Sequence, residues 1–179
     1  MRRLLPLLSL VLAACGDDAK PAAPADLAPL TGGSIAVTSR DFAPGAAIPK
    51  RHAKAPEGEN VQPTVSWGAL PDGTKEVVLL VDDADAPSPR PFVHWLAYGI
   101  DPKKLPFADA KDGKNDFGEV GWGGPLPPKG TGVHHYRFRV LALDKATSLP
   151  AGADFDAVLP ALKGHVLAEG RLVGTYERR

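Results

Sequence analysis

Acidic, imidazole and phenol side chains occur in this sequence at the ends of three apolar segments. Asp83 lies at the end of one segment, and His94 lies near the start of the next. His134 and Tyr136 lie at the start of a third. Two imidazoles and a phenol offer several hydrogen-bond donors, which favour a small oxyanion, and more strongly if a histidine is protonated. These residues therefore predict a pocket for a small charged ligand.

An ionised carboxylate in such a pocket would repel an anion. Asp83 must therefore share a proton, orient a histidine or meet the ammonium group of a zwitterionic head group. Asp82 and Asp85 have a plainer interpretation, as turn residues whose carboxylates accept backbone N–H groups. The plainer interpretation of His94 and His134 is that they are core histidines with satisfied hydrogen bonds. We favour ligand contact for these two because both lie at strand ends near Asp83.

The sequence offers little support for metal binding or catalysis. His134 and the adjacent His135 point to opposite faces of a strand, so they cannot both serve one metal site. No Gly-x-Ser-x-Gly elbow, catalytic cysteine or His-Glu-x-x-His motif occurs. We therefore expect a protein without cofactor, metal or enzymatic activity. The enzymatic alternative is a hydrolase or metal-dependent lyase that uses Asp83, Asp85, His94 and His134.

The elements that would position these residues are mostly β-strands. The continuous apolar run Val77–Val81 is typical of a strand covered on both faces. Phe92–Ile100 and Val133–Leu143 are expected as long strands, and a period of two places His134 and Tyr136 on one face of the second. Shorter strands are expected at Ser34–Thr38, at Ala47–Lys50, from Val65 onward and at Arg171–Tyr176.

The C-terminal part also contains helical patterns. The segment Asp154–Lys163 has apolar residues at helical spacing behind a capping Asp154. His165–Glu169 is expected to form another short turn of helix. The predicted fold is therefore mainly β, with short helices near the C-terminus.

Length and composition indicate one globular domain. With 179 residues, 44% of them hydrophobic and 23% charged, the chain can form a single domain with a real core. Its 21 basic and 21 acidic residues give a net charge of zero. This balance weighs against nucleic acid as a partner, because binding to phosphates needs a basic face.

The N-terminus has the pattern of an export signal. Met1-Arg2-Arg3 is positively charged, and Leu4–Leu12 is an apolar stretch too short to span a bilayer. The following Leu12-Ala13-Ala14-Cys15-Gly16 resembles a bacterial lipoprotein signal, in which cleavage leaves a lipid-modified Cys15. An ordinary secretory signal is the alternative. Cys15 is also the only cysteine, so no disulfide is possible within the domain.

These features divide the chain into three parts. Residues 1–14 are the predicted lipoprotein signal peptide, residues 15–33 the lipidated cysteine and a flexible tether, and residues 34–179 the folded domain. The lipid at Cys15 would anchor the protein to a membrane of the bacterial cell envelope. The outer membrane, facing the periplasm, is preferred over the inner membrane.

A loop rich in glycine and proline, Gly121–Gly132, directly precedes the third long strand. Its glycines would let backbone N–H groups approach an anion closely, while its prolines fix its shape. This signal alone is weak, since many surface loops share the composition.

Several motifs together resemble the phosphatidylethanolamine-binding proteins, also called Raf kinase inhibitor-like proteins. They are Asp83-Ala84-Asp85-Ala86-Pro87, then His94-Trp95, then the stretch from Gly123-Gly124-Pro125 to Lys129-Gly130-Thr131-Gly132-Val133-His134-His135-Tyr136. The segments Lys114–Gly118 and Lys163–Ala168 are similar to the bacterial YbhB/YbcL branch. The resemblance runs from about Ser34 to Tyr176.

The resemblance implies a β fold of two antiparallel sheets of Greek-key type, with a small pocket that takes an anion. It implies pocket side chains from Asp83, His94, His134 and Tyr136, backbone contacts from Gly123 and Gly124, and walls from Pro87 and Trp95. It also implies a cis bond between Ala86 and Pro87. The sequence departs from the family pattern at Ala84, Leu126 and His135, where proline, cysteine and arginine respectively are usual.

The function implied is non-catalytic binding of phosphate or a phosphorylated head group by an envelope lipoprotein. Some family members inhibit kinases or proteases, so inhibition or regulation of another envelope protein is an alternative. A hydrolase that uses the Asp/His pocket is less favoured. The sequence does not identify a protein partner.

Overall fold

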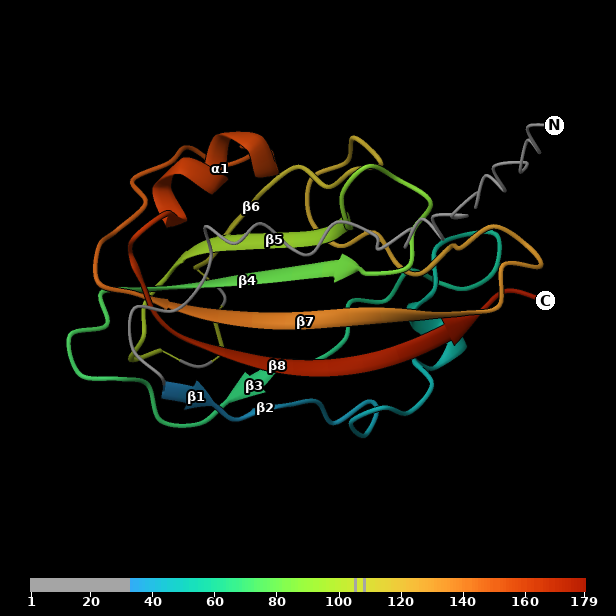
Figure 1. Cartoon of the computed structure of the whole chain (residues 1–179), viewed down its shortest axis with the longest axis horizontal. Coiled ribbons are helices and arrows are strands. Elements are labelled where there is room, and N and C mark those ends of the chain that lie inside the picture. Colours follow the sequence, from blue (N-terminus) through green and yellow to red (C-terminus); the bar gives the residue numbers. More distant parts are fainter. Residues whose placement is uncertain (1–32, 105, 108) are drawn as a thin grey trace, which may run out of the picture.

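Four long strands form the centre of the molecule, whose computed structural model describes residues 33–104, 106–107 and 109–179. Short strands at both edges complete a six-stranded sheet in the order β1-β8-β7-β4-β5-β6 (Figure 1). Neighbouring strands are antiparallel except for β1, which is parallel to β8. The strands are β1 (Gly33–Ile35), β4 (Glu76–Asp83), β5 (Phe92–Ile100), β6 (Lys111–Asp112), β7 (Val133–Leu143) and β8 (Val166–Glu177).

A smaller sheet and one helix cover the two faces of the large sheet. The antiparallel strands β2 (Val37–Thr38) and β3 (Ser66–Trp67) lie on one side and helix α1 (Phe155–Leu162) on the other (Figure 1). Every residue of β4 is buried as a result. Its odd-numbered apolar residues pack toward the small sheet, whereas Val78 and Leu80 pack toward α1. The prediction of a central strand covered on both faces is confirmed.

The mainly β fold is confirmed, with two differences in the details of the sheets. The large sheet is mixed, because Gly33–Ile35 pairs in parallel with β8. The predicted strand Ser34–Thr38 is divided, since its first half pairs in the large sheet and its second half in the small one. Gly33, assigned to the tether, begins β1. The predicted signal peptide and Cys15 lie outside the described residues.

The C-terminal helix is confirmed and the second helical turn is wrong. The side chain of Asp154 accepts a hydrogen bond from Ala157 N at 3.0 Å and so caps α1. The segment predicted as a turn of helix, His165–Glu169, instead begins β8 from Val166 onward. It pairs along its length with β7, and this tertiary pairing outweighs the local preference.

Two further expectations are corrected by the structure. Ala47–Lys50 is not a strand; Ala47 makes an isolated bridge to Thr175, and a 3₁₀ helix follows at Lys50–His52. The cis bond expected between Ala86 and Pro87 is absent from the described residues, where the Ala55–Pro56 bond is cis. Within the described part of the chain, no helix is long and apolar enough to cross a membrane.

Candidate functional site

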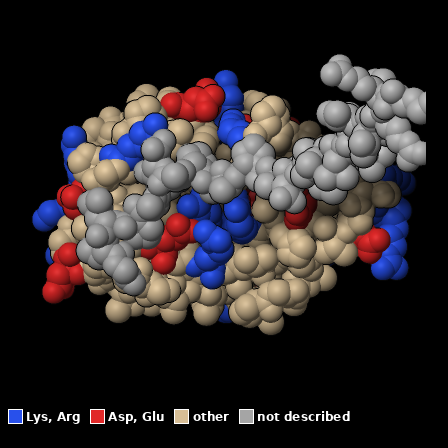
Figure 2. All heavy atoms as spheres, viewed as in Figure 1, with Lys and Arg blue, Asp and Glu red and all other residues tan. Residues whose placement is uncertain are grey.

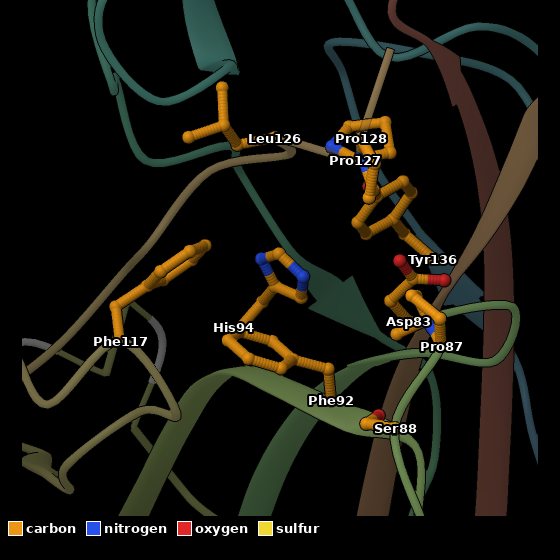
Figure 3. Close-up of a pocket in the computed structure, with 11 residues that line it drawn as sticks. Asp83, Pro87, Ser88, Phe92, His94, Phe117, Leu126, Pro127, Pro128 and Tyr136 are labelled. Atoms are coloured by element: carbon orange, nitrogen blue, oxygen red, sulfur yellow. The ribbon is translucent and has the colours of Figure 1, made fainter. Parts of the chain in front are cut away.

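A cavity of about 290 Å³ lies at the end of the large sheet where β4 ends and β5 and β7 begin (Figure 3). Four polar side chains contribute to its wall, and the other lining residues are apolar. Three of the apolar residues are prolines, which have no backbone N–H to offer a ligand. The lining residues are Asp83, Ala86, Pro87, Ser88, Phe92, His94, Phe117, Leu126, Pro127, Pro128 and Tyr136.

A β-bulge in β5 turns His94 toward this cavity. Val81 of β4 lies opposite Trp95, but the next residue of β4, Asp82, lies opposite Val93, so His94 is an extra residue in β5. A regular strand would place His94 and Trp95 on opposite faces, and a bulge breaks this alternation. Trp95 therefore packs in the core between the two sheets, while the adjacent His94 lines the cavity.

The imidazole of His94 is held in one orientation. Its Nδ1 lies 2.6 Å from the carbonyl oxygen of Gly123, which can only accept a hydrogen bond, so Nδ1 carries a proton. Burial lowers the pKa of His94, and this shift is opposed in part by hydrogen bonding to the backbone of Gly123, by the charge of nearby Asp83 and by the backbone of Gly124. The ring is therefore neutral at neutral pH, and its Nε2 then has a lone pair that makes no hydrogen bond of good geometry with the described residues.

Aromatic rings surround the imidazole. The ring of His94 lies between Phe117 on one side and Tyr136 on the other, with centroid distances of 5.4 Å and 5.0 Å (Figure 3). The Phe92 centroid lies 5.2 Å from it. These rings exclude water and so account for the burial that keeps His94 neutral.

The hydroxyl of Tyr136 is buried without a partner. Tyr136 is 0% exposed, and its Oη makes no hydrogen bond of acceptable geometry with the described residues. Burial raises the pKa of Tyr136 far above its ordinary value, and the charge of nearby Asp83 adds to this shift. The phenol therefore stays protonated at any physiological pH. It is a hydrogen-bond donor in the wall of the cavity, and although the Asp83 carboxylate lies close enough to influence it, the two form no hydrogen bond of good geometry.

Asp83 is held by two hydrogen bonds and is almost fully buried. Its Oδ1 accepts a hydrogen bond from Asp85 N at 2.8 Å, and its Oδ2 lies 2.7 Å from His134 Nδ1. The other ring nitrogen of His134, Nε2, lies 2.8 Å from Thr131 Oγ1. His134 thus lies behind Asp83, outside the lining of the cavity.

The hydrogen bonds around His134 define how many protons the Asp83–His134 pair holds. Thr131 Oγ1 donates its one hydrogen to the carbonyl of Pro128 at 2.8 Å, so toward His134 it can only accept. His134 Nε2 must then carry a proton, and a further proton lies between Nδ1 and Asp83. The pair is either imidazolium with carboxylate or imidazole with carboxylic acid. In both cases the net charge of the pair is zero, an arrangement that corresponds to two of the three roles considered for Asp83, a shared proton and the orientation of a histidine.

The predicted glycine amides are engaged within the protein. Gly123 N donates to His94 O at 2.8 Å, and Gly124 N donates to Asn60 Oδ1 at 2.7 Å. Neither residue lines the cavity, so the expected backbone contacts from these two glycines are not formed by their N–H groups in this arrangement. Gly124 serves close packing instead, because a Cβ there would lie 2.1 Å from His52 O.

The structure thus brings together only part of the predicted site. Asp83, Pro87, His94 and Tyr136 line the cavity, whereas His134 supports Asp83 from behind. Trp95 lies in the core and donates from Nε1 to Asp112. Whether these residues bind a ligand stays a prediction.

The neighbouring acids have separate partners. Asp85 Oδ2 accepts hydrogen bonds from the backbone and the ring of His135, which agrees with its interpretation as a turn residue. Asp82 differs, because it pairs with Arg137 through two hydrogen bonds of 2.6 Å and 2.8 Å. Both acids are therefore engaged away from the cavity wall.

Several wall residues were not identified from the sequence. They are apolar residues from two distant loops and from the first position of β5, and only the density of proline and aromatic residues there could have indicated them. Thr131 was also missed, because its contact with His134 depends on two hydrogen bonds that a sequence pattern does not predict. The apolar wall residues are Ala86, Phe92, Phe117, Leu126, Pro127 and Pro128.

No lysine or arginine lines the cavity among the described residues. Two cations close to lining residues have partners. Arg90 forms two hydrogen bonds with Asp116, and Lys54 lies over the Phe117 ring and pairs with Glu119. Within the described part of the chain, no three His, Cys, Asp or Glu side chains are grouped so that they could hold a metal ion. The wall of the cavity therefore offers hydrogen-bonding groups and apolar surface, without a side-chain cation of its own among the described residues.

Known proteins resemble this chain over most of its length. A family model described as phosphatidylethanolamine-binding protein matches residues 38–177. A UPF0098 protein of Aquifex aeolicus is 40% identical over 159 residues, which cover 82% of this chain and 91% of that protein. A Mycobacterium tuberculosis protein that is named as a lipoprotein, LppC, is 39% identical over 149 residues, or 80% of this chain and 72% of that protein.

Solved structures agree with these matches. The crystal structure of YbcL from Escherichia coli, described as a member of the mammalian PEBP family, superposes with a TM-score of 0.73. It is 31% identical in sequence, and the match covers 82% of this chain and all of YbcL.

Proposed function

The chain belongs to the phosphatidylethanolamine-binding protein family, and we propose that its cavity binds a small anion, such as phosphate or a phosphorylated head group, without catalysis. The buried hydroxyl of Tyr136 carries this proposal, because it is a donor that makes no hydrogen bond of good geometry with the described residues, not even with nearby Asp83. Leaving such a group unpaired costs about 1–3 kcal/mol, and an oxyanion in the cavity would remove that cost. The zero net charge of the Asp83–His134 pair removes the main electrostatic objection to an anion.

Binding can be tested by titrating the purified protein with phosphoethanolamine, followed by NMR and calorimetry. Tyr136→Phe deletes the donor and keeps the ring, and we expect it to weaken binding by about 10- to 100-fold, the value of a hydrogen bond to a charged group. Because the hydroxyl has no partner to lose, the same change should leave the free energy of unfolding unchanged or slightly higher.

Tyr98→Phe is a matched control. The Tyr98 hydroxyl lies on the opposite face of the sheet, where it donates to Pro150 O at 2.6 Å and accepts from Ala153 N at 3.0 Å. Its removal should lower the free energy of unfolding by about 1–3 kcal/mol without affecting binding. Equal affinity of wild type and Tyr136→Phe would contradict the proposal.

Hydrolysis is a second candidate because Thr131, His134 and Asp83 lie in the order of a hydroxyl–imidazole–carboxylate triad. The hydrogen bonds weigh against it. The Thr131 hydroxyl gives its hydrogen to Pro128 O, so His134 cannot act as the base that activates it in this arrangement. A screen with activated esters and phosphate esters tests this candidate. Turnover that both Thr131→Val and His134→Ala abolish would replace binding by catalysis as the function.

The export pattern and the relative named as a lipoprotein support a second part of the proposal. We propose that a lipid on Cys15 anchors the domain in the bacterial cell envelope, facing the periplasm from the outer membrane. A binding domain so placed would meet small phosphorylated compounds and lipid head groups.

A further inference from the structure

The lone pair on His94 Nε2 gives the cavity a requirement beyond size and charge. Nδ1 donates to Gly123 O, and the buried ring is neutral, so Nε2 can only accept a hydrogen bond. The carboxylate of Asp83, also in the wall, is a second acceptor. A ligand oxygen that faces these atoms must therefore carry a hydrogen.

The small number of free side-chain donors in the cavity wall also favours a ligand that carries a hydrogen. Of the four polar side chains that line the cavity in the described structure, Ser88 donates to Arg90 O and His94 donates to Gly123 O. Asp83 has no donor to spare when its proton lies toward His134. The hydroxyl of Tyr136 is left as the uncommitted side-chain donor. A fully ionised oxyanion would meet one side-chain donor, whereas His94 Nε2, Asp83 and the Ser88 oxygen can only accept.

The charged groups around His94 do not change this balance. Asp83 of β4 and Asp116, in the loop after β6, are the charged groups that act on it, and both are acids. His134 lies on the far side of Asp83 from the cavity, and the cation Arg90 is engaged by Asp116. Since His134 and Arg90 are already engaged by these two acids, a second negative charge on the ligand would find no cation among the described residues to neutralise it.

We propose that the cavity selects oxyanions that still bear a proton, with Tyr136 donating to an ionised oxygen and His94 Nε2 accepting from a protonated one. This inference rests on the proposed function. It predicts binding of phosphate and phosphate monoesters as monoanions, and rejection of sulfate, which has similar size and shape but no proton at neutral pH. His94 and Tyr136 are then the residues that determine specificity.

The competing account is that an arriving anion makes His94 take up a proton, so that both ring nitrogens donate. Sulfate distinguishes the two accounts, because a protonated His94 would donate to sulfate as well as to phosphate and the cavity would bind both. The ¹⁵N shifts of the His94 ring separate them independently, since they report directly whether Nε2 is protonated in the complex. Selection by a lone pair requires the neutral pattern of shifts to persist when phosphate is bound.

The experiment titrates the full-length protein with inorganic phosphate, phosphoethanolamine and sulfate at matched ionic strength. The second pKa of a phosphate ester is about 6, so the monoanion is abundant below that pH and scarce above it. We expect phosphoethanolamine to bind roughly 20-fold more weakly at about pH 7.5 than at about pH 5.5, and sulfate to bind at neither pH. Sulfate affinity equal to that of phosphate, or an imidazolium signal from His94 in the complex, would overturn the inference.

His94→Asn is the sharpest variant, because the asparagine amide can still donate to Gly123 O while the acceptor at Nε2 is lost. This variant should bind phosphate about tenfold more weakly, and the difference between its affinities for phosphate and sulfate should be smaller than in the wild type. His165→Asn is the matched control, at an exposed histidine that pairs with Asp144 away from the cavity. If no phosphate compound binds at either pH, the proposed function itself fails. If phosphate and sulfate bind alike, only the selection fails.

Discussion

At the scale of single residues, the site depends on where a few protons lie. Counting donors and acceptors around Thr131 and Pro128 gives His134 a proton on Nε2, and the same count around Gly123 gives His94 a proton on Nδ1. The two histidines therefore differ in role. His134 balances the charge of Asp83, while His94 presents a lone pair to the cavity.

The buried pair of Asp83 and His134 should contribute strongly to stability. His134→Ala leaves a carboxylate buried without its partner, which costs about 3–5 kcal/mol. Asp144 and His165 form a similar pair, with 2.8 Å between the atoms against 2.7 Å, but on the surface. Since exposed pairs are worth at most about 1 kcal/mol, His165→Ala should cost far less. Urea unfolding measures the free energy of unfolding of both variants. Equal decreases would show that the buried pair contributes no more to stability than the surface pair does.

His94 should make stability depend on pH. Burial lowers its pKa below the value of 6.5 that it has in the unfolded chain, so the unfolded chain takes up the proton first as the pH falls. The free energy of unfolding should therefore decrease as the pH falls below 6.5 toward the lowered pKa, and the His94 contribution should be constant above that window. Unfolding of His94→Asn across this range should show a smaller slope. An unchanged slope would assign the titration to another group.

At the scale of elements, the cavity is formed because β4, β5 and β7 meet at one end of the sheet. The strands could be predicted from the sequence, since apolar runs and a period of two determine β5 and β7 to the residue. The bulge at His94 could not, because it depends on the register between β4 and β5. The start of β8 was missed for a related reason, since pairing with β7 overrides a local helical preference.

The candidate site was predictable to a similar extent. The polar residues at strand ends identified the correct end of the sheet, and Asp83, His94 and Tyr136 do line its cavity. The roles of His134 and the two glycines depend on hydrogen bonds between distant loops. A pattern of residue types does not contain that information.

The tight approach of the Gly123–Gly124 segment to the 3₁₀ helix can be tested at Gly124. A Cβ at this position would lie 2.1 Å from His52 O and 2.6 Å from Lys54 N, which are backbone atoms that cannot move independently. Gly124→Ala should therefore lower the free energy of unfolding by about 2–3 kcal/mol. Gly68→Ala is the control, because its Cβ would meet Ala36 Cβ at an ordinary 3.5 Å. Similar losses for the two variants would contradict this role.

At the scale of the whole molecule, the charge balance does not favour electrostatic binding to an anionic membrane. The net charge is zero, and the face drawn in Figure 2 carries basic and acidic side chains next to one another. Attraction to anionic lipids needs a cluster of basic residues. Membrane attachment is therefore expected to depend on the lipid proposed for Cys15.

Cys15→Ser tests this dependence. Without a thiol the lipid cannot be attached, so we expect the variant to leave the membrane fraction and lose incorporation of labelled fatty acid. The cavity lies in the described domain and should keep its affinity for phosphoethanolamine. A variant that stays membrane-bound after a salt wash would contradict the anchor and require another means of attachment.

The most direct test of the central claim is a crystal structure of the protein grown with phosphate near pH 6. We predict phosphate density in the cavity, with one oxygen within about 3 Å of Tyr136 Oη and another within about 3 Å of His94 Nε2. A cavity without phosphate at a concentration that saturates the solution titration, or phosphate found only outside it, would contradict the account.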